Sequence, residues 1–189
     1  MFAVLNGIHP LTDECTQELS TLLEIRTIAK RDHFVHADEI ARDIGFVVKG
    51  LLRAYFTTPD GIEYNKTFFH ENTFALGFAS AIQQKPSIIQ FQALEDTSMV
   101  VFSFLKFRAL FERHRCLETL FRIVVEIEWI KKEERELRLA MNTAEERYDA
   151  FAKEYPGVEF RIPQYHVASH LGITPVQLSR IRSRRSTKG

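Results

Sequence analysis

The residues best suited to binding chemistry lie near the end of the chain, where glycine, proline, hydroxyl and arginine side chains follow a regular pattern. Gly172 suits the left-handed position of a sharp corner between two helices. Thr174 and Gln177 have the spacing of a capping box, and Pro175 suits the first position of the helix that follows. Residues 164–183 are therefore predicted to form a helix-turn-helix, a motif whose second helix enters the DNA major groove.

The outward face of that second helix carries the side chains that would contact DNA. Leu178 and Ile181 are predicted to face the first helix, which leaves Arg180 on the opposite face, where its guanidinium can bond a guanine bidentately. Arg184 and Arg185 lie further along the helix and suit phosphates, which position a protein without reading sequence. The predicted DNA-binding residues are Thr174, Pro175, Val176, Ser179, Arg180, Arg182, Ser183, Arg184 and Arg185, with Lys188 as a further phosphate contact.

Signals for catalysis and for metal binding are weak. His166 and His170 lie four residues apart, a spacing that could hold a metal, but we interpret them as exposed residues near phosphates. Cys15 and Cys116 are interpreted as buried apolar residues rather than redox sensors. The sequence has no glycine-rich phosphate loop, nucleophile elbow or zinc-protease motif. We therefore predict no catalytic residue, no metal and no cofactor.

The charge of the chain is divided unevenly. The 189 residues include 25 basic and 25 acidic side chains, but residues 157–189 hold six basic residues and one acidic residue. Such asymmetry is typical of a nucleic-acid-binding module attached to another domain, although a solvated basic terminus has the same composition. Two cysteines exclude a disulfide-built scaffold and a cysteine-ligated iron–sulfur cluster. No membrane span or secretory signal is found, so we expect a cytoplasmic protein.

Alternating apolar residues predict a strand domain upstream. Segments 51–57 and 62–69 alternate on either side of Pro59-Asp60-Gly61, which predicts a hairpin with a tight turn. Segments 88–94 and 98–104 predict a second hairpin in the same way. Several short antiparallel strands of this kind indicate a small barrel or roll.

Helices are predicted on both sides of the strands. Residues 11–30 have helical spacing after an N-cap at Thr12, and residues 105–114 form a short helix. The next helix continues to about Leu139, with a stripe of Leu117, Leu120, Val124, Ile127 and Ile130. Because one small domain cannot cover so long a helix, we predict that it packs against its own copy in a homodimer; an ordinary core helix is the alternative. A further helix begins near Thr143.

The order of the predicted elements resembles that of the Crp/Fnr family of bacterial transcription regulators: a leading helix, a strand domain, a long helix and a helix-turn-helix. The most specific parts are residues 46–53, the Asp60-Gly61 pair and residues 165–182. The resemblance implies an α+β fold in which an antiparallel β-roll of the cyclic-nucleotide-binding type (a double-stranded β-helix, cupin-like) precedes the long helix. Three domains are expected: a sensor roll over 1–115, a dimerisation helix over 116–141 and a DNA-binding domain over 142–189.

The resemblance also implies partners. These are double-stranded DNA, a second copy of the chain, a small-molecule effector and, for an activator, RNA polymerase. Family members with a full wing continue for a further hairpin after the second helix of the motif, so the end at Gly189 predicts a reduced or absent wing. The alternative is a small-molecule-binding or dimerising module whose terminal helices make protein–protein contacts.

The effector is not expected to be cyclic AMP. Relatives that bind cyclic AMP carry a Gly-Glu pair for the ribose and an Arg-Ser pair for the phosphate. Here Phe78 follows Gly77, the second pair is replaced by Ser87-Ile88, and Lys85 is the only cation between positions 74 and 93. Because a buried phosphate needs charge-assisted donors, the roll is predicted to bind a more apolar ligand or none. The candidate pocket residues are Phe74, Leu76, Gly77, Phe78, Lys85 and Ser87.

Overall fold

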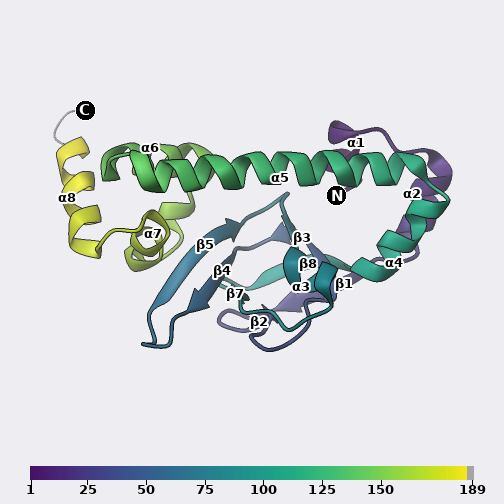
Figure 1. The fold of residues 1–189 in the computed structure, drawn as a ribbon, viewed down its shortest axis with the longest axis horizontal. Coiled ribbons are helices and arrows are strands. Elements are labelled where there is room, and N and C mark those ends of the chain that lie inside the picture. Colours follow the sequence, from purple (N-terminus) through teal and green to yellow (C-terminus); the bar gives the residue numbers. More distant parts are fainter. Residues whose placement is uncertain (187–189) are drawn as a thin grey trace.

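Strands fill the middle of the molecule, helices lie at its two ends, and one long helix, α5, runs along most of its length (Figure 1). The computed structural model describes residues 1–186. In chain order the elements are α1 (Phe2–Ile8), α2 (Asp13–Ser20), β1 (Glu24–Ile28), β2 (His33–Val35), β3 (Asp43–Lys49), β4 (Leu52–Thr57), β5 (Glu63–Phe69), β6 (Phe74–Ala75), α3 (Phe78–Gln83), β7 (Gln90–Ala93), β8 (Thr97–Ser103), α4 (Phe104–Ala109), η1 (Leu110–Glu112), α5 (Arg115–Met141), α6 (Ala144–Glu154), η2 (Val158–Phe160), α7 (Gln164–Leu171) and α8 (Pro175–Ser186).

The strands form two four-stranded antiparallel sheets, ordered β1-β8-β3-β6 and β2-β7-β4-β5. Apolar side chains from both sheets fill the space between them, among them Val47, Leu52, Phe91 and Met99. The chain passes from the first sheet to the second at Gly50, whose φ is +108°. A Cβ there would lie 2.7 Å from the Cα of Thr97. The positive φ and this close approach both require glycine at the corner. This is the predicted roll.

Two predictions about the secondary structure are wrong. Strands β7 and β8 do not form a hairpin, because β7 pairs with β2 and β4 whereas β8 pairs with β1 and β3. The predicted helix over 11–30 ends at Ser20, because Ile25, Thr27 and Ile28 lie in β1 and pair with β8. The N-cap at Thr12 is confirmed, since its hydroxyl accepts from the backbone N–H of Cys15.

The other local predictions agree with the structure. Strands β4 and β5 form the expected hairpin, and Gly61 in its turn has φ +80°. The long helix is α5, with 27 residues, and Thr143 begins α6 with a complete capping box to Glu146. Among the described residues, none of these helices combines the length and the apolar character needed to cross a membrane.

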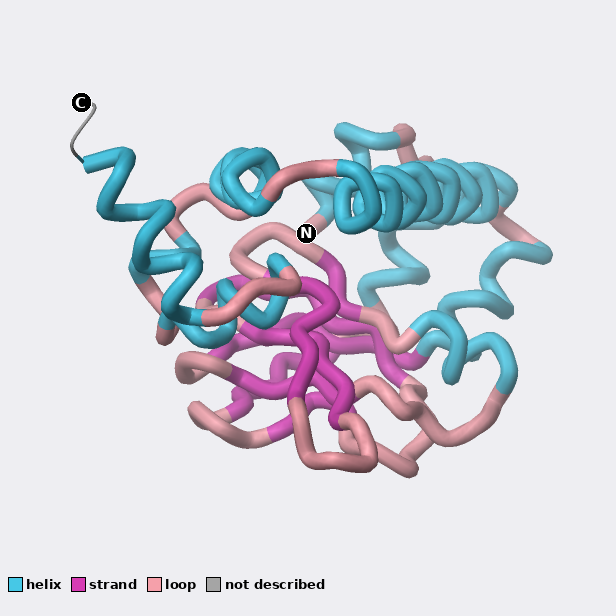
Figure 2. The backbone as a smooth tube through the Cα atoms, turned by 60° about the vertical axis from the view of Figure 1, so that its left-hand side comes forward, coloured by secondary structure: helices cyan, strands magenta, loops and turns pink. Residues whose placement is uncertain are grey.

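The C-terminal helices share an apolar core with the roll. Leu51 and Phe68 of the roll belong to the same buried cluster as Phe151 of α6 and Leu171 of α7. Figure 2 shows these helices packed beside the strands rather than apart from them. A second cluster lies at the opposite end, where α1, α2, α4 and the first turns of α5 meet. The roll is therefore held between two helical ends.

Candidate nucleic-acid interface

The predicted corner between two helices is present at the end of the chain. Gly172 ends α7 with φ +67°, a left-handed conformation that favours glycine. The backbone N–H of Thr174 donates to Oε1 of Gln177 over 2.9 Å, and that of Gln177 donates to the Thr174 hydroxyl over 3.2 Å, so the capping box is formed. Leu178 and Ile181 are buried against α7 and α6, as expected. The opposite face of α8 is left at the surface.

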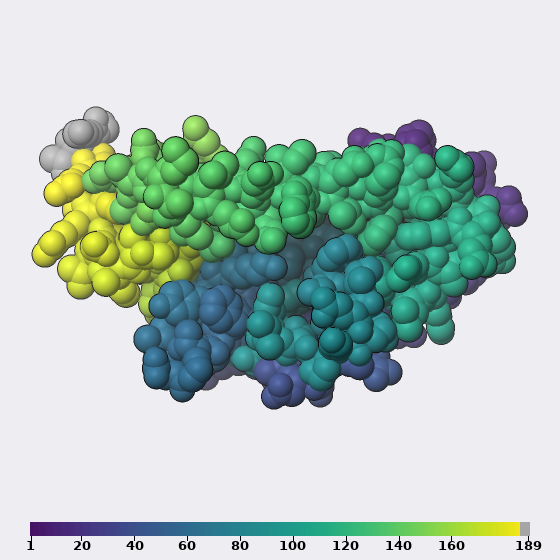
Figure 3. Space-filling model, viewed as in Figure 1, coloured from purple at the N-terminus to yellow at the C-terminus, as the bar shows by residue number. Residues whose placement is uncertain are grey.

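The exposed face of α8 presents the residues expected at base edges. Thr174, Pro175, Val176, Ser179, Arg180 and Ser183 are all exposed. The space-filling view shows the helix forming one end of the molecular surface (Figure 3). Within residues 1–186, Arg180 has no ion-pair partner, so its guanidinium is available to a ligand.

The remaining arginines of α8 have partners within the chain, which the sequence did not indicate. Arg184 pairs with Glu145 at 3.0 Å, Arg185 pairs with Asp149, and Arg182 lies 3.8 Å from Glu159. The pairs of Arg184 and Arg185 join exposed side chains and contribute at most about 1 kcal/mol each, whereas Glu159 is only 12% exposed and also accepts from the Tyr148 hydroxyl. Lys188 and the expected reduction of the wing concern positions outside the described residues.

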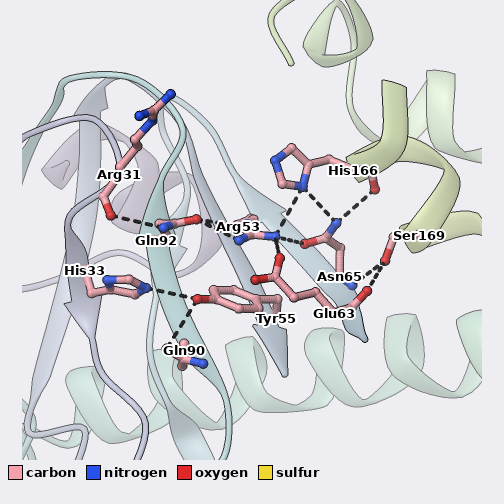
Figure 4. Close-up of polar contacts among 10 residues, drawn as sticks. All are labelled: Arg31, His33, Arg53, Tyr55, Glu63, Asn65, Gln90, Gln92, His166 and Ser169. Atoms are coloured by element: carbon pink, nitrogen blue, oxygen red, sulfur yellow. Dashed lines mark hydrogen bonds and ion pairs between the residues drawn. The ribbon is translucent and has the colours of Figure 1, made fainter. Parts of the chain in front are cut away.

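A network of polar side chains attaches α7 to the outer face of β4, β5 and β7 (Figure 4). At its centre Arg53 is only 4% exposed. Its Nε and Nη2 donate to Oε1 of Gln92 over 2.9 and 2.7 Å, its Nη1 donates to Glu63 over 2.5 Å, and its guanidinium stacks on Tyr55. Nη1 also lies 3.2 Å from Nδ1 of His166 on α7. A buried charge of the roll thus contacts the C-terminal helices directly.

Asn65 and Ser169 complete this attachment. The side-chain amide of Asn65 donates to the backbone carbonyl of His166 over 3.0 Å. The Ser169 hydroxyl accepts from the backbone N–H of Asn65 over 3.0 Å and donates to the carbonyl of Glu63 over 2.8 Å. Backbone groups of β5 are satisfied in this way by a helix about a hundred residues away in the chain.

Two further arginines connect the roll to the C-terminal part of the chain by hydrogen bonds. Arg135 of α5 donates to the backbone carbonyls of Asn65 and His170. Arg161, just after η2, forms bidentate bonds of 2.8–2.9 Å to both Glu71 and Glu95 at the end of the roll. The Arg161 guanidinium lowers the pKa of Glu71 to about 2. The orientation of α7, and of α8 after it, is therefore set by the roll.

The prediction that His166 and His170 are exposed is wrong. They are 4% and 6% exposed, because their shared helical face is the one that packs on the roll and α6. Burial lowers the pKa of His166 to about 4 and that of His170 to about 3. His170 lies against Phe68, Phe151 and Tyr155. Its Nδ1 has no hydrogen-bond partner in the part of the chain that the structure describes.

The candidate pocket residues of the roll serve mainly in packing. Phe74 packs on Phe46, and Phe78 lies exposed beside Phe121 of α5. The Ser87 hydroxyl is buried and donates to the carbonyl of Ile89. A Cβ on Gly77 would meet Ala41 at 2.5 Å, so the backbone approaches its neighbour closely. Leu76 belongs to the apolar cluster of the helical end, whereas Lys85 is exposed.

A cleft of about 470 Å³ lies elsewhere, between α5 and α6. Its walls carry charges of both signs, including Lys131, Glu134, Arg138 and Asp149. Among the described residues, no cluster of three or more histidine, cysteine or acidic side chains could hold a metal ion.

The apolar stripe of α5 changes character along the helix. Leu117 and Leu120 are buried in the core of the adjacent helical end, and Val124 is half-buried beside them. Ile127 and Ile130 are 40% and 55% exposed. They also belong to a seam spaced alternately by four and three residues, which the structure leaves uncovered along most of its length. The apolar members of the seam are Ile123, Ile127, Ile130, Leu137 and Met141, and the charged Glu134 interrupts it between Ile130 and Leu137.

Three features characterise the fold: a β-roll of two antiparallel sheets, a long helix with a largely exposed seam of mostly apolar residues, and a helical hairpin with an exposed arginine. Residues 25–114, from β1 to the start of α5, match the family model of the cyclic nucleotide-binding domain. Comparison with the curated proteins found no match.

Solved structures share the fold over most of the chain. FixK2 from Bradyrhizobium japonicum superimposes with a TM-score of 0.78 at 20% identity, over 88% of this chain and 86% of its own. CLP from Xanthomonas campestris, a c-di-GMP-responsive global regulator, has a TM-score of 0.70 at 13% identity, over 94% and 93%. A Eubacterium rectale protein assigned to the crp/fnr family of transcriptional regulators has 0.69 at 16% identity, over 95% and 85%. The fold is thus one that transcriptional regulators share.

Proposed function

We propose that the protein is a dimeric transcription regulator of the Crp/Fnr type that binds specific double-stranded DNA through α8. The observation that carries the proposal is the capped, exposed N-terminal half of α8 with the unpaired Arg180, on a fold shared with regulators of transcription. Such a regulator works in the cytoplasm, and an activator would also contact RNA polymerase. Selection of bound duplexes from a random library, followed by a mobility-shift assay across a salt titration, tests the proposal.

A DNA-binding protein and a protein-binding module give different results in that assay. A DNA-binding protein enriches one motif, and its affinity falls steeply with salt because bound phosphates release counterions. If the terminal helices instead make protein–protein contacts, no motif is enriched and α8 variants leave the residual binding unchanged. That second result would reject the proposal.

Replacing Arg180 by Ala should weaken binding to the selected site by about 1–3 kcal/mol and relax the preference at one base pair. The reason is that Arg180 lies on the face opposite Leu178, near the capped end of α8, where the groove floor is within reach. Arg184→Ala and Arg185→Ala are the matched controls, since both lie a turn further along and suit phosphates. Each should weaken all duplexes alike and lower the salt slope by about one. Equal losses on specific and random DNA in Arg180→Ala would contradict the assignment.

The proposed regulator does not use cyclic AMP as its effector. The only cation in the expected phosphate region, Lys85, is exposed, and the hydroxyl of Ser87 is bonded within its own loop. A cyclic phosphate would therefore lose its water without gaining a buried cation. Calorimetric titration with cyclic AMP should give no saturable heat at micromolar concentrations. Saturable micromolar binding that Lys85→Ala abolishes would contradict this, and would make Lys85 the phosphate ligand.

A further inference from the structure

A small inner cavity adjoins the cleft between α5 and α6, at the end of the molecule where these two helices meet α7 (Figure 1). The two spaces share Arg138, Ala150 and Glu154 in their walls. The inner cavity has a volume of about 20 Å³, which is room for one group of the size of a water molecule, whereas the cleft measures about 470 Å³. A ligand in the cleft can therefore place one small polar group in the inner cavity.

Three guanidinium groups line the inner cavity, and one carboxylate lies among them. Arg135 and Arg138 extend from α5, and Arg147 and Glu154 extend from α6. Arg138 is paired, since it lies 3.3 Å from Glu154 and 3.8 Å from Glu134 of the outer cleft. Within residues 1–186, neither Arg135 nor Arg147 forms an ion pair. The cavity wall therefore carries more positive than negative charge.

Arg135 and Arg147 donate to backbone carbonyls instead, and these bonds leave several of their N–H groups unused. Arg147 donates from Nε to the carbonyl of Leu171 over 2.9 Å and from Nη1 to that of Asn142 over 2.7 Å. Arg135 donates to backbone carbonyls through Nη2 alone. Nη2 of Arg147 and both Nε and Nη1 of Arg135 thus have no hydrogen-bond partner in the described part of the chain. Burial lowers the pKa of the Arg135 guanidinium below its ordinary value, as expected for a cation taken out of water.

His170 of α7 adds a further polar group to the wall of the inner cavity. The side chain is buried, and its Nδ1 lacks a hydrogen-bond partner among the residues that the structure describes. Such an atom is rare in folded proteins, because an unmade buried hydrogen bond is destabilising. A water molecule would satisfy Nδ1 but would leave the charges of Arg135 and Arg147 without a counter-charge. An anionic oxygen satisfies both needs, with Nδ1–H as its donor.

We propose that the inner cavity and the cleft together bind a small phosphate monoester. One phosphate oxygen occupies the inner cavity, where Arg135, Arg147 and His170 line the wall, and the rest of the ligand lies in the cleft. Phosphate suits this site because guanidinium groups bind its oxygens through charge-assisted hydrogen bonds. The charged walls of the cleft favour a polar substituent on the phosphate. Because Glu154 is the carboxylate nearest to Arg138, it competes with the ligand for that guanidinium.

Thermal unfolding of the full-length protein tests the proposal, with inorganic phosphate and glycerol 3-phosphate as the two probes and sodium chloride at matched ionic strength as the reference. We expect the thermal midpoint to rise with either probe and to saturate, because the probe binds the folded state alone. Glycerol 3-phosphate should saturate at the lower concentration, since its substituent occupies the cleft. Equal stabilisation by chloride would overturn the proposal, and so would an ester that binds no more tightly than inorganic phosphate.

Two variants of the cavity should change the affinity for glycerol 3-phosphate in opposite directions. Arg138→Gln removes a guanidinium that pairs only with carboxylates, so the variant should fold and bind about tenfold more weakly. Glu154→Gln removes the competing carboxylate and should bind more tightly than the unmodified protein. Arg108→Gln is the matched control, because it removes the same charge at an exposed position of α4 and should leave the affinity unchanged.

The outcomes of these variants separate this site from the proposed DNA-binding face. The proposal fails if Arg138→Gln keeps the full affinity or if Arg108→Gln loses as much affinity as Arg138→Gln. It also fails if Arg184→Ala abolishes the stabilisation, because the phosphate would then be bound at α8. Since each measurement is made without DNA, the results hold whether or not α8 binds a duplex.

Discussion

A chain carrying Ile127→Glu and Ile130→Glu is expected to sediment as a 22.0 kDa monomer at micromolar concentration, whereas the unmodified chain is expected to sediment at twice that mass. Both residues are exposed on the uncovered seam of α5. In a twofold dimer the two substitutions would bring four carboxylates into one apolar interface, and each buried unpaired carboxylate costs several kcal/mol. Binding to a two-half-site operator should fall with the loss of the dimer.

The control for this experiment adds the same charge elsewhere. Gln17→Glu and Thr57→Glu both lie at exposed positions outside α5 and should leave the sedimentation unchanged. The choice of Ile127 and Ile130 over Val124 follows from burial. Val124 packs partly in the core of its own chain, so a charge there would destabilise the monomer as well. A dimer of unchanged stability in the double variant would contradict the proposed interface.

Lowering the pH from about 8 to about 5 is expected to reduce the free energy of unfolding by about 3–4 kcal/mol through His166 and His170 alone. Burial holds their pKa values at about 4 and 3, whereas the unfolded chain has the ordinary value of 6.5. Below pH 6.5 the unfolded state therefore binds protons that the native state does not, and stability falls as the pH falls towards the folded values. Above about pH 7.5 this contribution is constant, because neither state then binds these protons. Urea unfolding at several pH values measures it.

Two variants assign that slope to the contact between α7 and the roll. His166→Gln should remove about half of the slope between pH 6.5 and 5, because one of the two buried histidines is gone. Ser169→Ala breaks the same contact without removing a histidine, so it should lower stability by a similar amount at every pH. Glu71, with its pKa near 2, affects the slope only below about pH 4.5, where its stabilising contribution begins to be lost. An unchanged slope in His166→Gln would contradict the explanation.

The sequence predicted those features whose physical cause lies within a few residues. Gly172, Thr174 and Gln177 define a corner and a cap by local chemistry, and the structure forms both. The turn at Gly61 was predictable for the same reason. The alternation of apolar residues also predicted β4 and β5 correctly, because successive side chains of a strand point to opposite faces of the sheet.

The features that the sequence missed depend on distant partners. Alternation in β7 and β8 is the same whether they pair with each other or with strands of separate sheets, so the corner between them could not be predicted. The histidines of α7 were mistaken for surface residues because nothing local shows that β5 covers that face. Arg184 and Arg185 likewise find their carboxylates on α6, some forty residues earlier.

The apolar cluster that includes Phe68 of the roll and Leu178 of α8 has a consequence for how this chain can be divided. A fragment beginning at residue 142 would leave Tyr155 and His170 without the strand that covers them, so it is expected to be partly unfolded or to aggregate. The same reasoning applies to chimeras, because exchanging the roll for that of a relative would bring unmatched side chains against α7. The C-terminal helices of this protein are therefore not expected to fold as an independent domain. Substitutions at the contact between the roll and these helices are expected to occur together during divergence.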